Sequence, residues 1–257
     1  MMELNIDSGW IGPGAFSVRH VPLHQLPMPA EHEIHLWYLH LGLLGGTLKH
    51  ALAGEKTTHE STQLNLEQLL FTRRFYLRLL LGAYLGIPGK EVVINRSNRG
   101  KPVLDASVHE SPLKFSMAKS RNRVLIGISS FHPVGVDLEP ADRKASDPKR
   151  LVKRFFSPAE FRQFEALGPD RLDETFLRAW ALNEAVVKAS GLGIANQLSR
   201  FTVEMDPRLP PAILDIENDD AANWSLALIR PSDEFVGAVA SRQARLDFSC
   251  FQLLPVD

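Results

Sequence analysis

The sequence predicts an α+β protein with antiparallel sheets, on three observations. Several short runs rich in Val, Ile, Phe, Trp and Tyr lie between Pro and Gly residues, as strands do. Two longer segments, residues 66–84 and 173–190, carry the residue pattern and end signals of helices. Strands and helices do not alternate in the long series that a doubly wound parallel sheet requires.

Composition and charge narrow the class of protein. Of the 257 residues, 44% are hydrophobic and 23% are charged, which is typical of a globular protein rather than a disordered one. The formal net charge of −1 disfavours nucleic acid as a partner. Cys250 is the only cysteine, which rules out an intrachain disulfide and fits a reducing compartment. No secretory signal is recognisable and no apolar run is long enough for a bilayer, so we expect a cytoplasmic protein without a membrane partner.

The first half is expected to contain one long helix and several strands. Asn65, followed by Gln68, is typical of a helix N-cap, and Gly86 ends the apolar periodicity that follows. Residues 44–64 are polar and contain glycine, which indicates an irregular connection. Extended segments are expected at residues 15–21, 34–41, 91–95 and 101–104.

The second half has the same mixture. The runs 124–131 and 134–139 are separated by a His-Pro step, which predicts an antiparallel hairpin. Ser157 is an expected N-cap, with Pro next and Glu three residues later, and a longer helix is expected at 173–190. Further strands are expected at residues 201–205, 213–216, 224–229 and 235–240.

Two acidic residues share one face of an expected strand. In Gly135-Val136-Asp137-Leu138-Glu139, alternation places Asp137 and Glu139 on one side, roughly 7 Å apart at their Cα atoms. Two carboxylates so placed repel one another unless a cation lies between them, and hard oxygen ligands suit Mg²⁺. The alternative is a half-exposed strand whose acids face water.

A second group lies on the expected helix at 173–190. Trp180, Glu184 and Lys188 are spaced four residues apart, so they form one stripe along the helix. The stripe is either part of a site or an ordinary surface ion pair beside a core aromatic residue.

Basic residues form a third group. Lys101 lies in a Gly-Lys-Pro turn, and the segment 115–121 contains serines, Lys119 and an arginine, a composition suited to phosphate. Arg73 and Arg74 lie in the first long helix. Solvated loops and ion-paired arginines are the alternative.

The order of these pieces resembles the 4′-phosphopantetheinyl transferase superfamily, in its larger, surfactin-synthetase-activating (Sfp-like) type. The resemblance rests on Gly100-Lys101-Pro102, Phe115-Ser116-x-x-x-Ser120, Gly135-x-Asp137-x-Glu139, Arg154-Phe155-Phe156-Ser157-x-x-Glu160 and Trp180-x-x-Asn183-Glu184-x-x-x-Lys188. It implies a monomeric pseudo-dimer of two similar α+β subdomains, which we place at residues 1–130 and 131–257. The second would carry the acidic site.

The resemblance also implies residue roles. Asp137 and Glu184 look like direct Mg²⁺ ligands, with Glu139 completing the acidic site directly or through water. Glu184 looks like the base that takes the proton of the attacking serine. Lys188 looks like the cation that meets the phosphates of coenzyme A and assists the leaving group.

Further basic residues look like coenzyme A contacts. Lys101 and one or both of Arg73 and Arg74 correspond to contacts with the adenosine phosphates. Lys119 stands where the family usually has a histidine that touches the nucleotide 3′-phosphate. Asn183 stands where the family usually has a lysine.

The implied reaction moves 4′-phosphopantetheine from coenzyme A to a serine of an acyl or peptidyl carrier protein, in fatty acid, polyketide or nonribosomal peptide biosynthesis. The main alternative is a non-catalytic homologue that only binds coenzyme A or a carrier protein. A Mg²⁺-dependent phosphohydrolase and an interaction protein without a ligand are two further alternatives.

Overall fold

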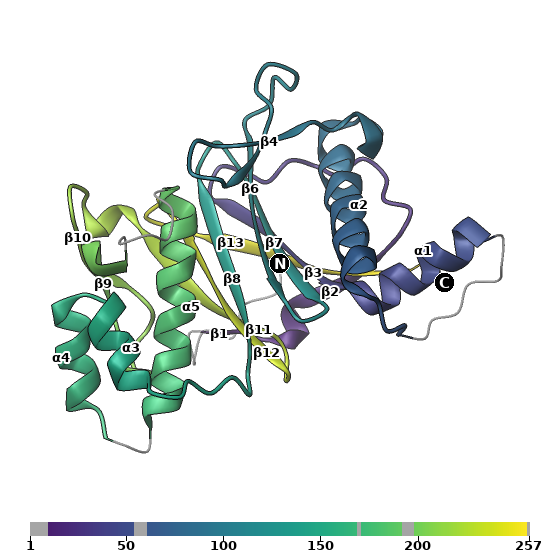
Figure 1. Ribbon diagram of the computed structural model, residues 1–257. Helices are drawn as coiled ribbons and strands as arrows, with labels where there is room; N and C mark the ends of the chain where they lie inside the picture. The colour runs from purple at the N-terminus through teal and green to yellow at the C-terminus, as the bar shows by residue number, and fades with distance from the viewer. Residues whose placement is uncertain (1–9, 54–60, 169–170, 192–197, 256–257) are drawn as a thin grey trace.

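The computed structural model describes residues 10–53, 61–168, 171–191 and 198–255. Two main sheets lie face to face, with helices on the outer side of each, so that Figure 1 shows four layers. From right to left these are helices α1 and α2, a five-stranded sheet, a four-stranded sheet, and helices α3 to α5. Most strand pairs are antiparallel, which confirms the predicted α+β class.

The five-stranded sheet has the order β2-β13-β3-β7-β6. Its strands are β2 (Phe16–His20), β13 (Asp247–Leu254), β3 (Glu33–His40), β7 (Arg123–Ser130) and β6 (Leu113–Ser120). Strand β13 runs parallel to both of its neighbours, whereas the β3–β7 and β7–β6 pairs are antiparallel. A strand from the end of the chain thus lies inside the sheet of the first half.

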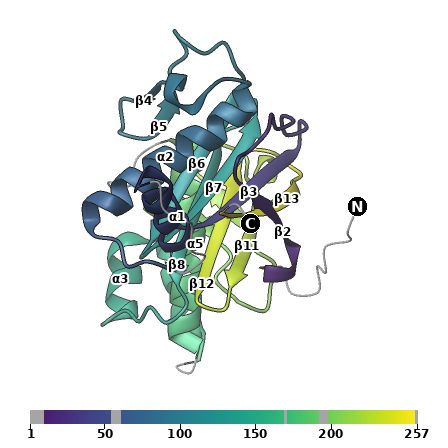
Figure 2. The same cartoon turned by 90° about the vertical axis from the view of Figure 1, so that its right-hand side faces the viewer.

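Helices α1 (Leu41–Ala53) and α2 (Leu66–Leu85) cover this sheet. Helix α2 begins at Asn65 with the predicted capping box and ends at Gly86, whose left-handed φ of 68° glycine adopts without strain. A two-stranded hairpin of β4 (Ile94–Arg96) and β5 (Pro102–Leu104) follows the short 3-10 helix η3 (Gly89–Glu91). Figures 1 and 2 show this hairpin at one end of the molecule, beyond the main sheets.

The irregular connection predicted at residues 44–64 is wrong in its first part, because α1 occupies residues 41–53. Tertiary packing overrides the low helix propensity of its glycines. Leu41 and Leu44 are buried against α2, and a Cβ on Gly45 would meet the Leu64 side chain at 2.5 Å. The glycines therefore let neighbouring side chains pack closely against helix α1, and they do not mark a loop.

The four-stranded sheet has the order β1-β11-β12-β8. Its strands are β1 (Trp10–Ile11), β11 (Ser225–Ser232), β12 (Phe235–Ser241) and β8 (Val134–Pro140). Helix α5 (Leu172–Ser190) packs on its outer face, and a smaller β9–β10 pair, β9 (Phe201–Val203) and β10 (Ile213–Ile216), lies nearby. Helices α3 (Pro148–Phe155) and α4 (Pro158–Ala166) flank α5, and short 3-10 turns complete the order at η2 (Pro13–Ala15), η5 (Leu198–Arg200) and η6 (Ala221–Asn223).

The predicted hairpin of residues 124–131 and 134–139 is wrong. Strand β7 forms its hairpin with β6, through a turn in which Arg121 has a φ of 51°, and β8 pairs with β12. The chain leaves β7 at Phe131, with a φ of 70°, and passes into the other sheet. Strands β6 and β8 nevertheless lie side by side at one edge of the sandwich, where the Val136 amide donates to Ser116 Oγ at 3.2 Å.

The core between the sheets joins the two halves of the chain. It contains Leu36 and Leu125 from the five-stranded sheet and Val136 and Val239 from the four-stranded sheet, all buried.

The subdomain division at 130/131 falls between β7 and β8 and stays a prediction. Within the described residues, no helix combines the length and apolarity that crossing a membrane requires.

Candidate active site

Strand β8 directs two carboxylates towards α5. Val136 and Leu138 point into the core between the sheets, so Asp137 and Glu139 point to the opposite face, as alternation predicts. Asp137 is 6% exposed, and its Oδ1 accepts a hydrogen bond from Lys188 Nζ at 2.6 Å. Its Oδ2 is buried without a hydrogen-bond partner among the described residues.

Helix α5 brings Glu184 and Lys188 to this strand. The helix lies so close to β8 that a Cβ on Gly135 would be 2.0 Å from the Ala185 carbonyl oxygen. Glu184, one residue earlier, is 7% exposed and lies near both acids of β8. The third member of the predicted stripe, Trp180, packs against Phe156 and Phe176. The Arg143 guanidinium lies over the Trp180 ring, 5.2 Å from its centre.

The three carboxylates interact electrostatically. Burial, opposed by Lys188 and reinforced by the negative charges of Asp137 and Glu139, raises the pKa of Glu184. Burial and Asp137 likewise raise the pKa of Glu139, although Arg143 forms an ion pair with it. A region of concentrated negative potential thus lies between β8 and α5.

The chemistry of these residues fits a hard divalent cation. They supply carboxylate oxygens, the ligand type that Mg²⁺ prefers, and one oxygen of Asp137 is buried without a partner. In the part of the chain that the structure describes, no three acidic, histidine or cysteine side chains form a ready metal site. Instead, Lys188 forms an ion pair with Asp137 and Arg143 forms one with Glu139.

Lys101 lies beside the same strand and helix. Its Nζ donates to the Val134 carbonyl at 3.0 Å and to the Lys188 carbonyl at 2.6 Å. Burial, together with the charge of Lys188, lowers the pKa of Lys101 to about 8. The turn before β5 is thereby tied to the start of β8 and the end of α5, a contact that the turn sequence alone does not reveal.

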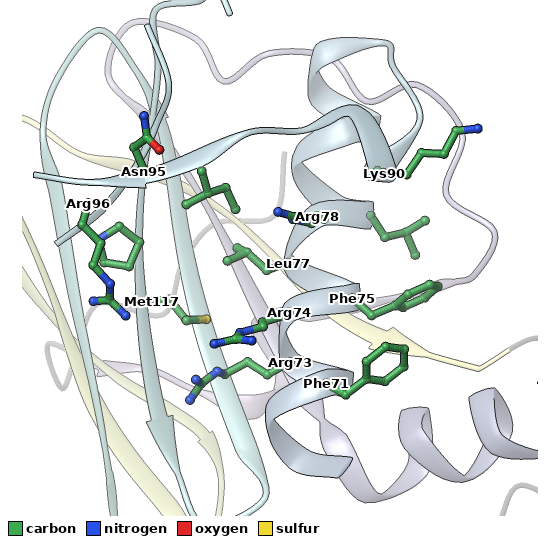
Figure 3. A pocket seen from close by; sticks show the side chains of 14 residues that line it. Phe71, Arg73, Arg74, Phe75, Leu77, Arg78, Lys90, Asn95, Arg96 and Met117 are labelled. Carbon is green, nitrogen blue, oxygen red and sulfur yellow. The ribbon is translucent and has the colours of Figure 1, made fainter. Parts of the chain in front are cut away.

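A basic pocket of about 680 Å³ lies between α2, the β4–β5 hairpin and β6 (Figure 3). Arg73, Arg74 and Arg96 line it, and Figure 3 shows their side chains directed towards the same region. Burial, together with Arg74 and Arg96, lowers the pKa of Arg73, and its buried Nε has no partner among the described residues. Convergent guanidinium groups suit a phosphate.

The sequence predicted two of these arginines and missed Arg96. Arg96 lies in the strand that leads into the Gly-Lys-Pro turn, and this position could have marked it as a candidate. Only the fold, however, shows that the strand turns this side chain towards the pocket. Lys119 lies on the same strand as Met117, two residues along and therefore on the same face, and is exposed. It does not line the pocket itself.

The chain is similar to known proteins of one superfamily. Residues 133–240, which include β8 and α5, match the model of the 4′-phosphopantetheinyl transferase superfamily. The chain is 33% identical over 214 residues to the 4′-phosphopantetheinyl transferase HetI of Nostoc sp., a match that covers 81% of this chain and 87% of HetI.

More distant relatives are matched over shorter regions. The L-aminoadipate-semialdehyde dehydrogenase-phosphopantetheinyl transferase of Xenopus laevis is 30% identical over 52% of this chain and 47% of its own length. The 4′-phosphopantetheinyl transferase of Bacillus subtilis is 29% identical over 41% of this chain and 44% of its own length. The chain belongs to the 4′-phosphopantetheinyl transferase superfamily. Membership confirms the predicted family and enzyme class.

Proposed function

We propose that this protein transfers 4′-phosphopantetheine from coenzyme A to a serine of an acyl or peptidyl carrier protein, in a Mg²⁺-dependent reaction. The observation that carries the proposal is the meeting of Asp137 and Glu139 of β8 with Glu184 and Lys188 of α5. This group lies in the region that matches the superfamily model.

Asp137 and Glu184 would hold the cation, with Glu139 completing the acidic group directly or through water. When bound, Mg²⁺ supplies positive charge that neutralises the diphosphate of coenzyme A and stabilises the oxygen that leaves. Asp137 Oδ2 is the oxygen best suited to this role, because it has no partner among the described residues.

Glu184 is the proposed base. The serine hydroxyl loses its proton to Glu184, directly or through water, as its oxygen forms a bond to the phosphorus of the phosphopantetheine group. The bond from that phosphorus to the bridging oxygen breaks, and adenosine 3′,5′-bisphosphate leaves with the electron pair. Burial and the neighbouring carboxylates raise the pKa of Glu184, which makes it a stronger proton acceptor.

Lys188 is the proposed contact to the leaving phosphates. It now donates to Asp137, so contact with the diphosphate requires its ammonium group to turn from the carboxylate to the substrate. Its position one helical turn beyond Glu184 supports this exchange, because both side chains extend from the same face of α5.

The basic pocket is the proposed site of the nucleotide phosphates. Arg73, Arg74 and Arg96 converge there, and the exposed Lys119 lies on the same face of β6 as Met117, which lines the pocket. Lys101 is proposed to support the nucleotide site as well, from its place against Val134 and the end of α5. We further expect a monomer that acts in the cytoplasm, without nucleic acid or membrane as partner.

The test is incubation of the protein with coenzyme A, Mg²⁺ and a panel of apo carrier proteins, followed by mass spectrometry of each carrier. The proposal expects one carrier serine to gain the mass of one phosphopantetheine group. Release of the nucleotide without any carrier would indicate a phosphohydrolase. Thermal stabilisation by coenzyme A without transfer would indicate a binding protein, and no stabilisation would indicate that coenzyme A is not a ligand.

A further inference from the structure

A buried carboxylate outside the acidic group connects three elements. Glu160, in the first turn of α4, is 0% exposed. Its Oε2 accepts from the Ser157 amide at 2.8 Å, and its Oε1 accepts from the Val203 amide of β9 at 3.2 Å. The same Oε1 accepts from Asn183 Nδ2 of α5 at 2.9 Å. One side chain thus holds the start of α4, strand β9 and the middle of α5 together.

The described groups that face this carboxylate are neutral. They are the backbone amide of Ser157 at the start of α4, the backbone amide of Val203 in β9 and the side-chain amide of Asn183 in α5. Burial raises the pKa of Glu160 to about 7, although the hydrogen bonds from Asn183, Ser157 and Val203 act in the opposite direction. A carboxyl group buried among neutral donors needs their hydrogen bonds, because removing one donor leaves a buried acceptor unsatisfied.

Asn183 places this connection next to the acidic group. It is 0% exposed and immediately precedes Glu184, and its Nδ2 also donates to the Ala179 carbonyl one turn earlier. Residues adjacent in a helix lie about 100° apart around its axis. The side of α5 that meets Glu160 therefore fixes the direction in which Glu184 points towards β8.

We propose that Glu160 and Asn183 form a positioning pair, which sets the rotation of α5 about its axis and thereby the place of Glu184 and Lys188. Among the described residues, none of the pair's hydrogen bonds goes to Asp137, Glu139 or the Glu184 side chain, so the pair acts through α5. The inference rests on the proposed function for its kinetic consequence, and on the structure alone for its effect on stability.

The stability effect has a definite sign. The folded protein keeps a proton on Glu160 that the unfolded chain has released, between the ordinary glutamate pKa of 4.5 and about 7. The stabilisation from the protonated form is complete below about pH 4.5 and is lost as pH rises through about 7. A cation at position 183 would stabilise the ionised Glu160 carboxylate, so the folded protein would no longer lose stability as pH rises through about 7.

The experiment compares three variants with the wild type. Asn183→Leu removes the donor at similar volume, and Asn183→Lys supplies a cation that can reach Glu160. Thr175→Val is the matched control, because Thr175 is fully buried on the same helix and its hydroxyl has no partner among the described residues. The readouts are the thermal unfolding midpoint from about pH 5 to 9, and kcat and KM for coenzyme A.

We expect Asn183→Leu to lower kcat about 10- to 100-fold with little change in KM, since a small misplacement of Glu184 is enough. Asn183→Lys should keep kcat within about threefold, and its midpoint should rise relative to the wild type as pH increases through about 7. Thr175→Val should change neither kinetic constant. If Asn183→Leu does not fold, Asn183→Ala replaces it, because it removes the same donor with a smaller side chain.

Two results would overturn the pair. One is a folded Asn183→Leu, or the Asn183→Ala that replaces it, with kcat within about twofold of the wild type. The other is an Asn183→Lys midpoint that follows the wild type at every pH. Failure of the wild type to modify any carrier would count against the proposed function instead, and the comparison of midpoints would still decide whether the pair exists.

Discussion

At the scale of single residues, Asp137 presents its two oxygens to different surroundings. Oδ1 accepts from the Lys188 ammonium, and Oδ2 has no partner among the described residues. A buried acceptor without a partner costs about 1–3 kcal/mol. The cost is a reason to regard Asp137 as a residue kept for a ligand rather than for stability.

Lys119 gives a prediction at the same scale. Lys119→Ala should weaken coenzyme A binding about tenfold, because one charge-assisted hydrogen bond contributes about 1.5–3 kcal/mol. Isothermal calorimetry measures the affinity. Lys114→Ala is the control, since Lys114 is also exposed on β6 but lies on the other face. Equal affinity of the wild type and Lys119→Ala would show that Lys119 does not contact the nucleotide.

Single residues were predicted well where a short-range rule applies. Strand alternation placed Asp137 and Glu139 together, and helical spacing placed Glu184 and Lys188 on one stripe. The contacts of Lys101 with two carbonyl groups were not foreseen, because its long side chain reaches elements that only tertiary structure brings near. Arg96 was missed for the same reason, because only tertiary structure brings it near Arg73 and Arg74.

At the scale of elements, the site depends on how closely α5 approaches β8. Gly135 makes this approach feasible, since a Cβ there would lie 2.0 Å from the Ala185 carbonyl oxygen and 2.4 Å from the Ala189 nitrogen. Both atoms belong to helix backbone, so no rotamer change can relieve the clash. The distance between Asp137 and the Glu184–Lys188 stripe is therefore set by a glycine.

Gly135→Ala should separate α5 from β8. We expect it to lower the free energy of unfolding by more than about 1 kcal/mol, as overpacking does, and to reduce transfer more than stability alone explains. Denaturant unfolding and kcat measure the two effects. Gly14→Ala is the control, because no atom lies within 4 Å of a Cβ there. A Gly135→Ala variant as stable and active as Gly14→Ala would refute the close contact.

Elements with strong end signals were predicted to within a few residues, including α2, α4 and α5. Helix α1 was missed, because its glycines read as a loop while packing against α2 makes it helical. The hairpin of β7 and β8 was wrong, because partners of neighbouring strands depend on which sheet each joins. Strand β13 was missed, although it lies between β2 and β3 in the first half's sheet.

At the scale of the whole molecule, the two halves of the chain exchange strands. Strand β13 lies between β2 and β3, and β1 pairs with β11. Lys101 adds a link from the β4–β5 hairpin to β8 and α5. The expectation of two similar subdomains came from family resemblance, and periodicity alone could not show this exchange.

The exchange predicts that residues 1–130 do not fold alone. Without β13, strands β2 and β3 lose their shared neighbour, and backbone groups along both strands lose their hydrogen bonds. We expect no cooperative thermal transition for this fragment by circular dichroism. Addition of a peptide spanning residues 244–257 should restore part of the transition. A cooperative transition in the fragment alone would contradict the structural role of β13.

The proposed reaction requires Asp137 of β8 and Glu184 of α5 to act together on one substrate. The most direct measurement is the rate of carrier modification by Asp137→Ala and by Glu184→Gln at saturating Mg²⁺, each checked for a native unfolding transition. Either change should lower the rate by at least about 100-fold in a folded protein. Near wild-type turnover in either folded variant would contradict it.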